Sequence, residues 1–243
     1  MRLFVSNRYN ASTKILAGYD IIIKTMKEDG AMNFIRARGE EQKKIRIQQI
    51  VDAAAMLYEE VGYDKVTFSQ IGRKLSFSRL NLYNYYHCKE DIFLTLLLQD
   101  RWKMVEDARK TFSEAVTDRD AFCLAWASLM LRHQRMLSLF SITNTVILRD
   151  ASPEMHRRFR MEMSQAADEL IALAQKMFPQ FTPEQAYNFV ECESSYALTL
   201  YPASLEYKTS QHIDFFPDVG RGTRDFVSLY VPFLKILLKG LEK

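Results

Sequence analysis

The run from Val66 to Asp91 contains the start signals of two short helices, and it limits the possible folds more than any other part of the chain. Thr67 and Gln70 stand three residues apart, which is the spacing of a capping box: the hydroxyl accepts from a backbone amide and the glutamine side chain reaches back. Ser78 is placed to cap the helix that follows. We therefore predict a helix after Thr67, a tight turn, and a second helix over residues 78–86.

The second predicted helix has two unlike faces when its residues are laid out at about 100° per residue. Leu82 and Tyr86 share the inward face. An isolated protein gains little from exposing a leucine and two tyrosines beside two asparagines. A helix in the major groove of DNA explains this face, whereas the alternative is a helix packed on the protein's own C-terminal part. The outward residues are Leu80, Asn81 and Asn84, flanked by Tyr83 and Tyr85.

The positive charge of the chain is concentrated around these two helices. Residues 33–89 carry ten Lys and Arg against six Asp and Glu, a net charge of +4, whereas residues 90–243 carry 18 against 21, a net charge of −3. An amphipathic helix begins near Ile45, and Gly62 supplies its stop signal. This arrangement favours a protein that contacts phosphates, because DNA binding needs positive charge near the recognition element.

Taken together, these markers resemble the N-terminal domain of the tetracycline-repressor (TetR) family of bacterial regulators, over about residues 45–93. The resemblance implies an all-α chain, with a three-helix helix-turn-helix DNA-binding domain over residues 34–91. A helical regulatory and dimerisation domain would then occupy residues 92–243. The markers are Ile50, Ala53, Ala54, Leu57, Tyr58, Gly62, Tyr63, Val66, Thr67, Ile71, Ser78, Leu82, Tyr83, Tyr85, Tyr86, Lys89 and Glu90.

The resemblance also implies specific DNA contacts. Lys89 opens the next helix, so its ammonium and the helix N-terminus are expected to act on the same phosphate. The residues expected at backbone phosphates are Thr67, Ser78, Tyr83, Tyr85 and Lys89. Those expected at bases or the adjacent backbone are Arg79, Leu80, Asn81 and Asn84.

Three positions depart from the usual pattern of the family. Ser76 stands where the turn glycine is common, Leu75 replaces a small residue before the turn, and Leu80 replaces a small residue after Arg79. We expect a left-handed Ser76 to destabilise the turn by about 1 kcal/mol. Leu80 is expected to alter the base preference, since its side chain can contact a thymine methyl group.

From Glu90 onward the sequence predicts helices. Ser152 and Pro153 form a start signal, with serine as cap and proline at the first helical position. Thr182 and Gln185 form a second capping box. The expected helices span residues 91–113, 118–141 with a break near 138–141, 152–178, 182–205 and 224–243, the last kinked at Pro232 after a loop over 211–222.

The apolar stripe on the last two helices is wider than packing within a single chain usually buries. We predict a two-fold dimer through a four-helix arrangement, which the resemblance also implies; the alternative is that the stripe is entirely internal core. A dimer lets two recognition helices meet half-sites about one DNA turn apart. The predicted interface residues are Phe189, Tyr196, Leu200, Phe226, Tyr230, Phe233 and Leu237.

Family members usually hold a small-molecule pocket in the C-terminal body, and the resemblance implies one here. Asn144 and His133 are the best polar candidates, because one or two polar groups orient a ligand in an apolar pocket. The alternative for the apolar members is ordinary core packing. The candidate lining residues are Phe122, Trp126, Met130, His133, Phe140, Asn144 and Met163.

The sequence offers little for other classes of protein. Paired carboxylates on one face, a Cys/His or Ser/His arrangement and a Gly-rich phosphate loop are missing, so we predict no enzyme and no cofactor. Three separated cysteines without a CxxC pair argue against a disulfide framework or a metal site and for a reduced cytoplasmic compartment. The chain has no apolar run of the roughly 18 residues that a membrane span needs.

These observations predict a cytoplasmic, sequence-specific transcriptional regulator that binds a palindromic operator as a homodimer. It is expected to act as a repressor that responds to a small-molecule effector. The alternatives are a small all-α enzyme or ligand-binding protein that uses the C-terminal pocket, and a regulator controlled by a protein partner.

Residues 1–33 form an N-terminal extension with no clear period. Lys27, Glu28 and Asp29 can be encoded by a purine run that resembles a bacterial ribosome-binding site just ahead of Met32. We therefore hypothesise that translation starts at Met32. The alternative is a real disordered arm that touches DNA.

Overall fold

The computed structural model describes residues 39–209 and 225–241, and over these two ranges the chain is helical, with no strand. This confirms the predicted all-α class. The chain divides into two units, Met1–Asp52 and Ala53–Lys243. The predicted extension, residues 1–33, and the predicted loop, residues 211–222, lie outside the described residues.

The first helix spans residues 39–61, and its apolar stripe is buried at Ile50, Val51 and Ala54. It ends at Gly62, whose φ of 78° lies in the left-handed region that glycine enters without a Cβ clash. A short 3₁₀ turn, η1 (Tyr63–Lys65), follows. The predicted stop signal at Gly62 is therefore confirmed.

The two short helices of the opening run are α2 (Phe68–Lys74) and α3 (Arg79–Tyr83). Thr67 Oγ1 accepts from the Gln70 amide at 3.2 Å while Gln70 Oε1 accepts from the Thr67 amide at 2.8 Å, which confirms the capping box. Ser78 Oγ likewise caps α3. The second helix was predicted to end at residue 86, which is wrong, because it ends at Tyr83. The amides of residues 85 and 86 both donate to the Leu82 carbonyl, which tightens the last turn.

The turn between α2 and α3 depends on Gly72 and Ser76. A Cβ at residue 72 would lie 3.0 Å from the Phe77 carbonyl oxygen and 3.3 Å from Leu82 Cδ1, so a larger side chain would push α3 away. Ser76 has a φ of 55° and therefore keeps the left-handed conformation, which is expected to destabilise the turn at this position. The close approach of α3 to α2 thus requires glycine at residue 72 and places the backbone of Ser76 in a strained conformation.

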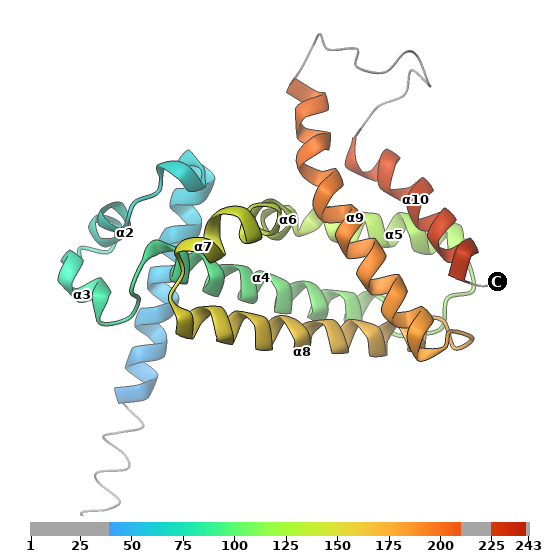
Figure 1. Cartoon of the computed structure of the whole chain (residues 1–243), viewed down its shortest axis with the longest axis horizontal. Helices are drawn as coiled ribbons and strands as arrows, with labels where there is room; N and C mark the ends of the chain where they lie inside the picture. The colour runs from blue at the N-terminus through green and yellow to red at the C-terminus, as the bar shows by residue number, and fades with distance from the viewer. Residues whose placement is uncertain (1–38, 210–224, 242–243) are drawn as a thin grey trace, which may run out of the picture. The chain divides into compact units, whose positions relative to one another are not determined.

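The C-terminal body begins with α4 (Lys89–Thr111), which lies beside α8 (Pro153–Met177) in Figure 1. The helix α9 (Pro183–Thr209) packs on α8 and on α10 (Phe226–Leu241). Both predicted start signals are confirmed, since Ser152 caps α8 and Thr182 forms a capping box with Gln185. The remaining elements are α5 (Arg119–Arg132), α6 (Gln134–Ser141), a π-helical turn η2 (Thr143–Ile147) and α7 (Leu148–Asp150).

The helix predicted over residues 118–141 is interrupted at His133, where α5 ends and α6 begins. His133 leaves the helical conformation with a ψ of 37°, and its Nε2 lies 3.1 Å from Asp107 Oδ2 on α4. The predicted break near residues 138–141 agrees with the end of α6 at Ser141, whereas the earlier one was missed. The apolar pattern of residues 118–141 runs on without a break at His133, but the packing against α4 divides this segment into the two helices α5 and α6.

We predict that Ser76→Gly raises the free energy of unfolding by about 0.5–1 kcal/mol, because glycine removes the Cβ clash at positive φ. The measurement is urea unfolding of the full chain. Ser76→Ala keeps the Cβ and serves as the matched control, for which no gain is expected. Equal effects of the two changes would show that the backbone at this residue carries no such strain.

Candidate nucleic-acid interface and effector cavity

The outward face of α3 is open to solvent. Leu80 is 75% exposed and Asn81 and Asn84 are exposed, whereas Leu82 is fully buried against α2. Tyr86 is also buried, so the exposures agree with the division of the helix into an inward and an outward face. A leucine, two asparagines and a neighbouring tyrosine ring are thus presented together on one short helix.

The residues that flank α3 are held by local contacts. The ring of Tyr83 packs on that of Phe68, with centroids 4.9 Å apart, and Tyr85 is half-buried. Thr67 and Ser78 are exposed, and their hydroxyl oxygens accept the helix-capping bonds. The side chain of Arg79 lies outside the described atoms. Helix capping and ring packing therefore hold Thr67, Ser78 and Tyr83 in place before any DNA arrives.

Lys89 has a structural role that the sequence did not predict. Its ammonium donates to the carbonyl oxygens of Tyr63 and Val66 at 3.2 and 3.1 Å, and it lies 4.3 Å from the centroid of the Tyr63 ring. An ammonium has three N–H donors, so two of them are used to tie α4 to η1. The predicted phosphate contact of Lys89 would have to be made by the third.

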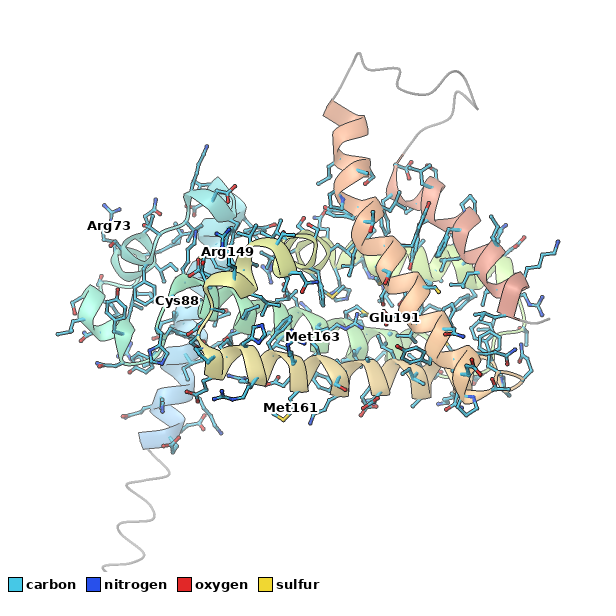
Figure 2. The ribbon with its side chains drawn as sticks, viewed as in Figure 1. Arg73, Cys88, Arg149, Met161, Met163 and Glu191 are labelled. Atoms are coloured by element: carbon cyan, nitrogen blue, oxygen red, sulfur yellow. The ribbon has the colours of Figure 1, made fainter. Side chains whose placement is uncertain are left out.

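A cavity of about 200 Å³ lies within the body, between α4, α5, α6, α8 and α9. Met163 on α8 and Glu191 on α9, both labelled in Figure 2, mark two of its sides, whereas Met161 points to solvent. Three of the predicted pocket residues line this cavity: Met130, Phe140 and Met163. The other lining residues are Arg101, Met136, Ala167, Val190, Glu191, Ser194, Ser195 and Leu198.

The other four predicted pocket residues lie elsewhere. Phe122 and Trp126 pack in an aromatic cluster with Phe112, Phe178 and Phe189. His133 is bound to Asp107, and burial lowers the pKa of its imidazole even though the carboxylate opposes the shift. Asn144 is exposed on η2. Phe122 and Trp126 therefore belong to ordinary core packing, which is the alternative given for them above.

Two buried charged residues were missed by the sequence analysis. Arg101 lines the cavity and is 5% exposed. Glu193 is fully buried, and its carboxylate accepts from Tyr230 Oη at 2.6 Å, Trp126 Nε1 at 3.1 Å and Ser194 Oγ at 2.7 Å. Desolvation lowers the pKa of the Arg101 guanidinium and raises the pKa of the Glu193 carboxyl.

A signal for these residues was present in the helical pattern. Arg101 follows Leu97 by four residues and precedes Met104 by three, so it stands on the apolar stripe of α4. Glu193 likewise follows Phe189 by four residues. Because charges are rarely buried without a partner, a charge on an apolar stripe is a marker of a functional or paired group.

An ion-pair cluster joins Glu59, Asp100 and Arg135, which all lie in the unit Ala53–Lys243. Arg135 on α6 binds both oxygens of Asp100 on α4 through Nε and Nη2, at 2.8 and 2.7 Å. Its third nitrogen, Nη1, donates to Glu59 at 3.0 Å. Bidentate guanidinium–carboxylate pairs are directional, so this contact constrains the orientation of α6. Asp100 and Arg135 are chain neighbours of the cavity residues Arg101 and Met136.

Two family models cover nearly all of the described chain. Residues 50–96 match the model described as "Bacterial regulatory proteins, tetR family", and residues 98–243 match "Tetracyclin repressor-like, C-terminal domain". The chain belongs to the tetracycline-repressor family. The predicted family is thus confirmed, and the chain is a DNA-binding transcriptional regulator of that family.

Relatives of this TetR-family chain include regulators of fatty acid metabolism. The "Fatty acid metabolism regulator protein" of Bacillus subtilis is 27% identical over 84 residues, which span 35% of this chain and 43% of that protein. The structure of the fatty acid degradation regulator FadR from Bacillus halodurans is similar with a TM-score of 0.53 and 18% identity, over 80% of this chain and 98% of the other.

Two further structures share the fold. FadR from Bacillus subtilis, in complex with stearoyl-CoA, has a TM-score of 0.52 at 18% identity, covering 79% of this chain and 98% of the other. FadR from Thermus thermophilus, in complex with lauroyl-CoA, has a TM-score of 0.53 at 18% identity, covering 80% and 94%. These likenesses concern the fold of the TetR-family chain.

The predicted dimer residues divide into two groups in this TetR-family chain. Tyr196, Phe233 and Leu237 remain partly exposed on α9 and α10, and the rings of Tyr196 and Phe233 stack at 3.9 Å. The other four are buried among the helices of the single chain. These are Phe189, Leu200, Phe226 and Tyr230.

Metal and membrane features can be assessed for the described part of the chain. Within residues 39–209 and 225–241, no group of three His, Cys, Asp or Glu side chains is arranged to hold a metal ion. The helices over the same residues include none with the length and apolar character needed to cross a membrane.

We predict that Asn81→Ala and Asn84→Ala change the base preference of operator binding by about 1–3 kcal/mol at the positions they face. Tyr83→Phe removes a hydroxyl beside the helix and is expected to weaken binding to all sequences about equally. The measurement is a gel-shift series with operators substituted one base pair at a time. If the asparagine and tyrosine variants behave alike, the assignment of these side chains to bases and phosphates fails.

Proposed function

We propose that the protein is a cytoplasmic repressor that binds a palindromic operator in double-stranded DNA as a homodimer and releases it when a small-molecule effector binds the body. The observation that carries the proposal is the exposed outward face of α3, with Leu80, Asn81 and Asn84 above the buried Leu82. A chromosomal operator places its site of action in the cytoplasm.

The charge distribution supports DNA as the partner. The net charge of +4 over residues 33–89 favours phosphate contact by the same part of the chain that holds α2 and α3. Phosphate contacts position a protein on the duplex, whereas base contacts specify the sequence. The proposed division assigns Tyr83 and Tyr85 to phosphates and the outward residues of α3 to base edges.

Exposed apolar residues on the last two helices support the dimer. Ile236 on α10 is 71% exposed, and Tyr187 and Leu205 on α9 are also exposed. Together with Phe233 and Leu237 they give α9 and α10 a partly uncovered apolar face. We propose that a second copy covers this face about a two-fold axis, so that two α3 helices address the two halves of a palindrome.

The cavity in the body supports a small-molecule effector with an apolar chain. Methionine side chains from α5, α6 and α8 line it, and these flexible side chains adapt to a ligand. Two similar proteins have been crystallised with stearoyl-CoA and lauroyl-CoA. We therefore propose that the effector carries an aliphatic chain that lies among these methionines.

The ion-pair cluster of Glu59, Asp100 and Arg135 supplies a route from this cavity to the first helix. Met136 faces the cavity while its neighbour Arg135 holds Glu59, so a ligand that displaces α6 also displaces the guanidinium. The effector shifts the equilibrium only if it binds the two arrangements of α6 with different affinity. The protein is thus proposed to act by coupled binding and not by catalysis.

A gel shift on the DNA that flanks the gene tests the proposal. We expect binding to one palindrome by two chains, with affinity that falls steeply as salt rises because phosphate contacts release counterions. Sedimentation of the free protein at micromolar concentration is expected to give the dimer mass. Absence of any DNA affinity at low salt would refute the regulator function, and a stable monomer would refute the dimer.

We predict that Arg135→Gln lowers operator affinity about three- to tenfold, because the loss of the pairs to Asp100 and Glu59 loosens the first helix against the body. The readout is the dissociation constant for the operator at fixed salt. Arg149→Gln, which breaks an exposed pair with Asp150, is the matched control and is expected to leave affinity unchanged. Equal affinities of the two variants would show that the Arg135 cluster does not support DNA binding.

A further inference from the structure

Arg101 places a guanidinium in a cavity whose walls are otherwise largely apolar. Its side chain is 5% exposed, and its Nε has no hydrogen-bond partner among the described residues. A buried donor without a partner destabilises the folded state. Because Arg101 lines the cavity, an anionic group there would be attracted by its guanidinium, so Arg101 points to a ligand with a negative charge.

The burial of the lining residues gives the cavity a closed end and a mouth. Arg101, Met130 and Met136 are buried, whereas Met163 and Leu198 are half-buried. Glu191 and Ser195 on α9 are exposed, and Glu191 is labelled on this helix in Figure 2. The guanidinium therefore lies toward the closed end and a carboxylate lies at the mouth.

Glu193 does not remove the need of Arg101 for a hydrogen-bond acceptor. Its carboxylate already accepts from Tyr230, Trp126 and Ser194, although its charge is close enough to stabilise the guanidinium electrostatically. Arginine keeps its proton in proteins, so the guanidinium itself stays charged. One fixed positive charge is thus combined with methionine walls.

We propose that the effector is an aliphatic monocarboxylic acid that enters acid group first, with its carboxylate bound by Arg101. Its chain then lies along Met130, Met136 and Met163 toward the mouth. This inference rests on the effector role proposed above and adds the chemical class and the orientation of the ligand. A guanidinium matches a carboxylate in charge and in the planar geometry of its donors.

The proposed orientation distinguishes a free acid from a coenzyme A thioester. With its chain toward the mouth, a coenzyme A thioester would offer Arg101 only the uncharged thioester carbonyl, and its large nucleotide would have to occupy the closed end of a cavity of about 200 Å³. The negative charge of Glu191 at the mouth disfavours a second acid group at the far end of the chain. The ligand differs in this respect from the stearoyl-CoA and lauroyl-CoA of the two similar structures.

Calorimetric titration of the full chain with octanoate, 1-octanol and octanoyl-CoA tests the inference. These three probes share one chain length and differ at the head group. We expect the dissociation constant of octanoate to be about tenfold or more below that of octanol, because only the acid satisfies the buried guanidinium. Octanoyl-CoA is expected to bind more weakly than octanoate, and octanoate is expected to release operator DNA in the gel shift.

Paired variants assign the selectivity to Arg101. The double change Arg101→Met with Glu193→Gln removes both buried charges, since loss of one alone would leave the other uncompensated in the core. We expect this variant to bind octanol like the wild type and to bind octanoate no better than octanol. Glu193→Gln alone keeps the guanidinium and is expected to retain or increase the preference for the acid.

The possible outcomes separate this inference from the effector role. Equal affinity of the wild type for octanoate and octanol, tighter binding of octanoyl-CoA, or acid preference in the double variant would overturn acid recognition by Arg101 while leaving an effector site in place. Failure of all three probes to bind would overturn both the proposed effector role and acid recognition by Arg101. Selectivity of the wild type decides the question even if the double variant does not fold.

Discussion

The packing of Leu82 against the backbone at Gly72 determines what the N-terminal helices can present to DNA. Leu82 Cδ1 would lie 3.3 Å from a Cβ at residue 72, so Leu82 occupies the space that a side chain at this position would need. Because Leu82 is fully buried there, residues two positions before and after it on this short helix must face outward. Leu80, Asn81 and Asn84 are exposed as a consequence of this single contact and the strained turn at Ser76.

Two helices of the C-terminal body each carry two consecutive residues with different roles: one lines the cavity and the other forms an ion pair. On α4, Arg101 lines the cavity while Asp100 binds Arg135. On α6, Met136 lines the cavity while Arg135 binds Glu59. Successive residues on a helix are about 100° apart, so one helix can line a cavity and hold an ion pair at the same level. Any ligand that moves α4 or α6 would therefore move the ion-pair cluster as well.

Much of the fold was predictable because its signals are local. The capping boxes at Thr67 and Thr182, the serine caps, and the stop at Gly62 each involve atoms within a few residues of one another. The site was less predictable. Three of seven pocket residues line the cavity, and Arg101, its most distinctive member, was missed although it interrupts an apolar stripe.

The sequence by itself determined the helical class, the helix start signals and the face of α3 that is exposed, because periodicity and capping depend on neighbours along the chain. The tertiary structure alone decided the partners of Lys89, the burial of Arg101 beside the cavity, and the burial of Phe189 and Tyr230 in the chain's own core. These outcomes depend on which helices meet. From the sequence alone, a long cationic side chain can equally bind a phosphate, a backbone carbonyl or a ligand. An apolar stripe can equally pack within the chain or against a second subunit.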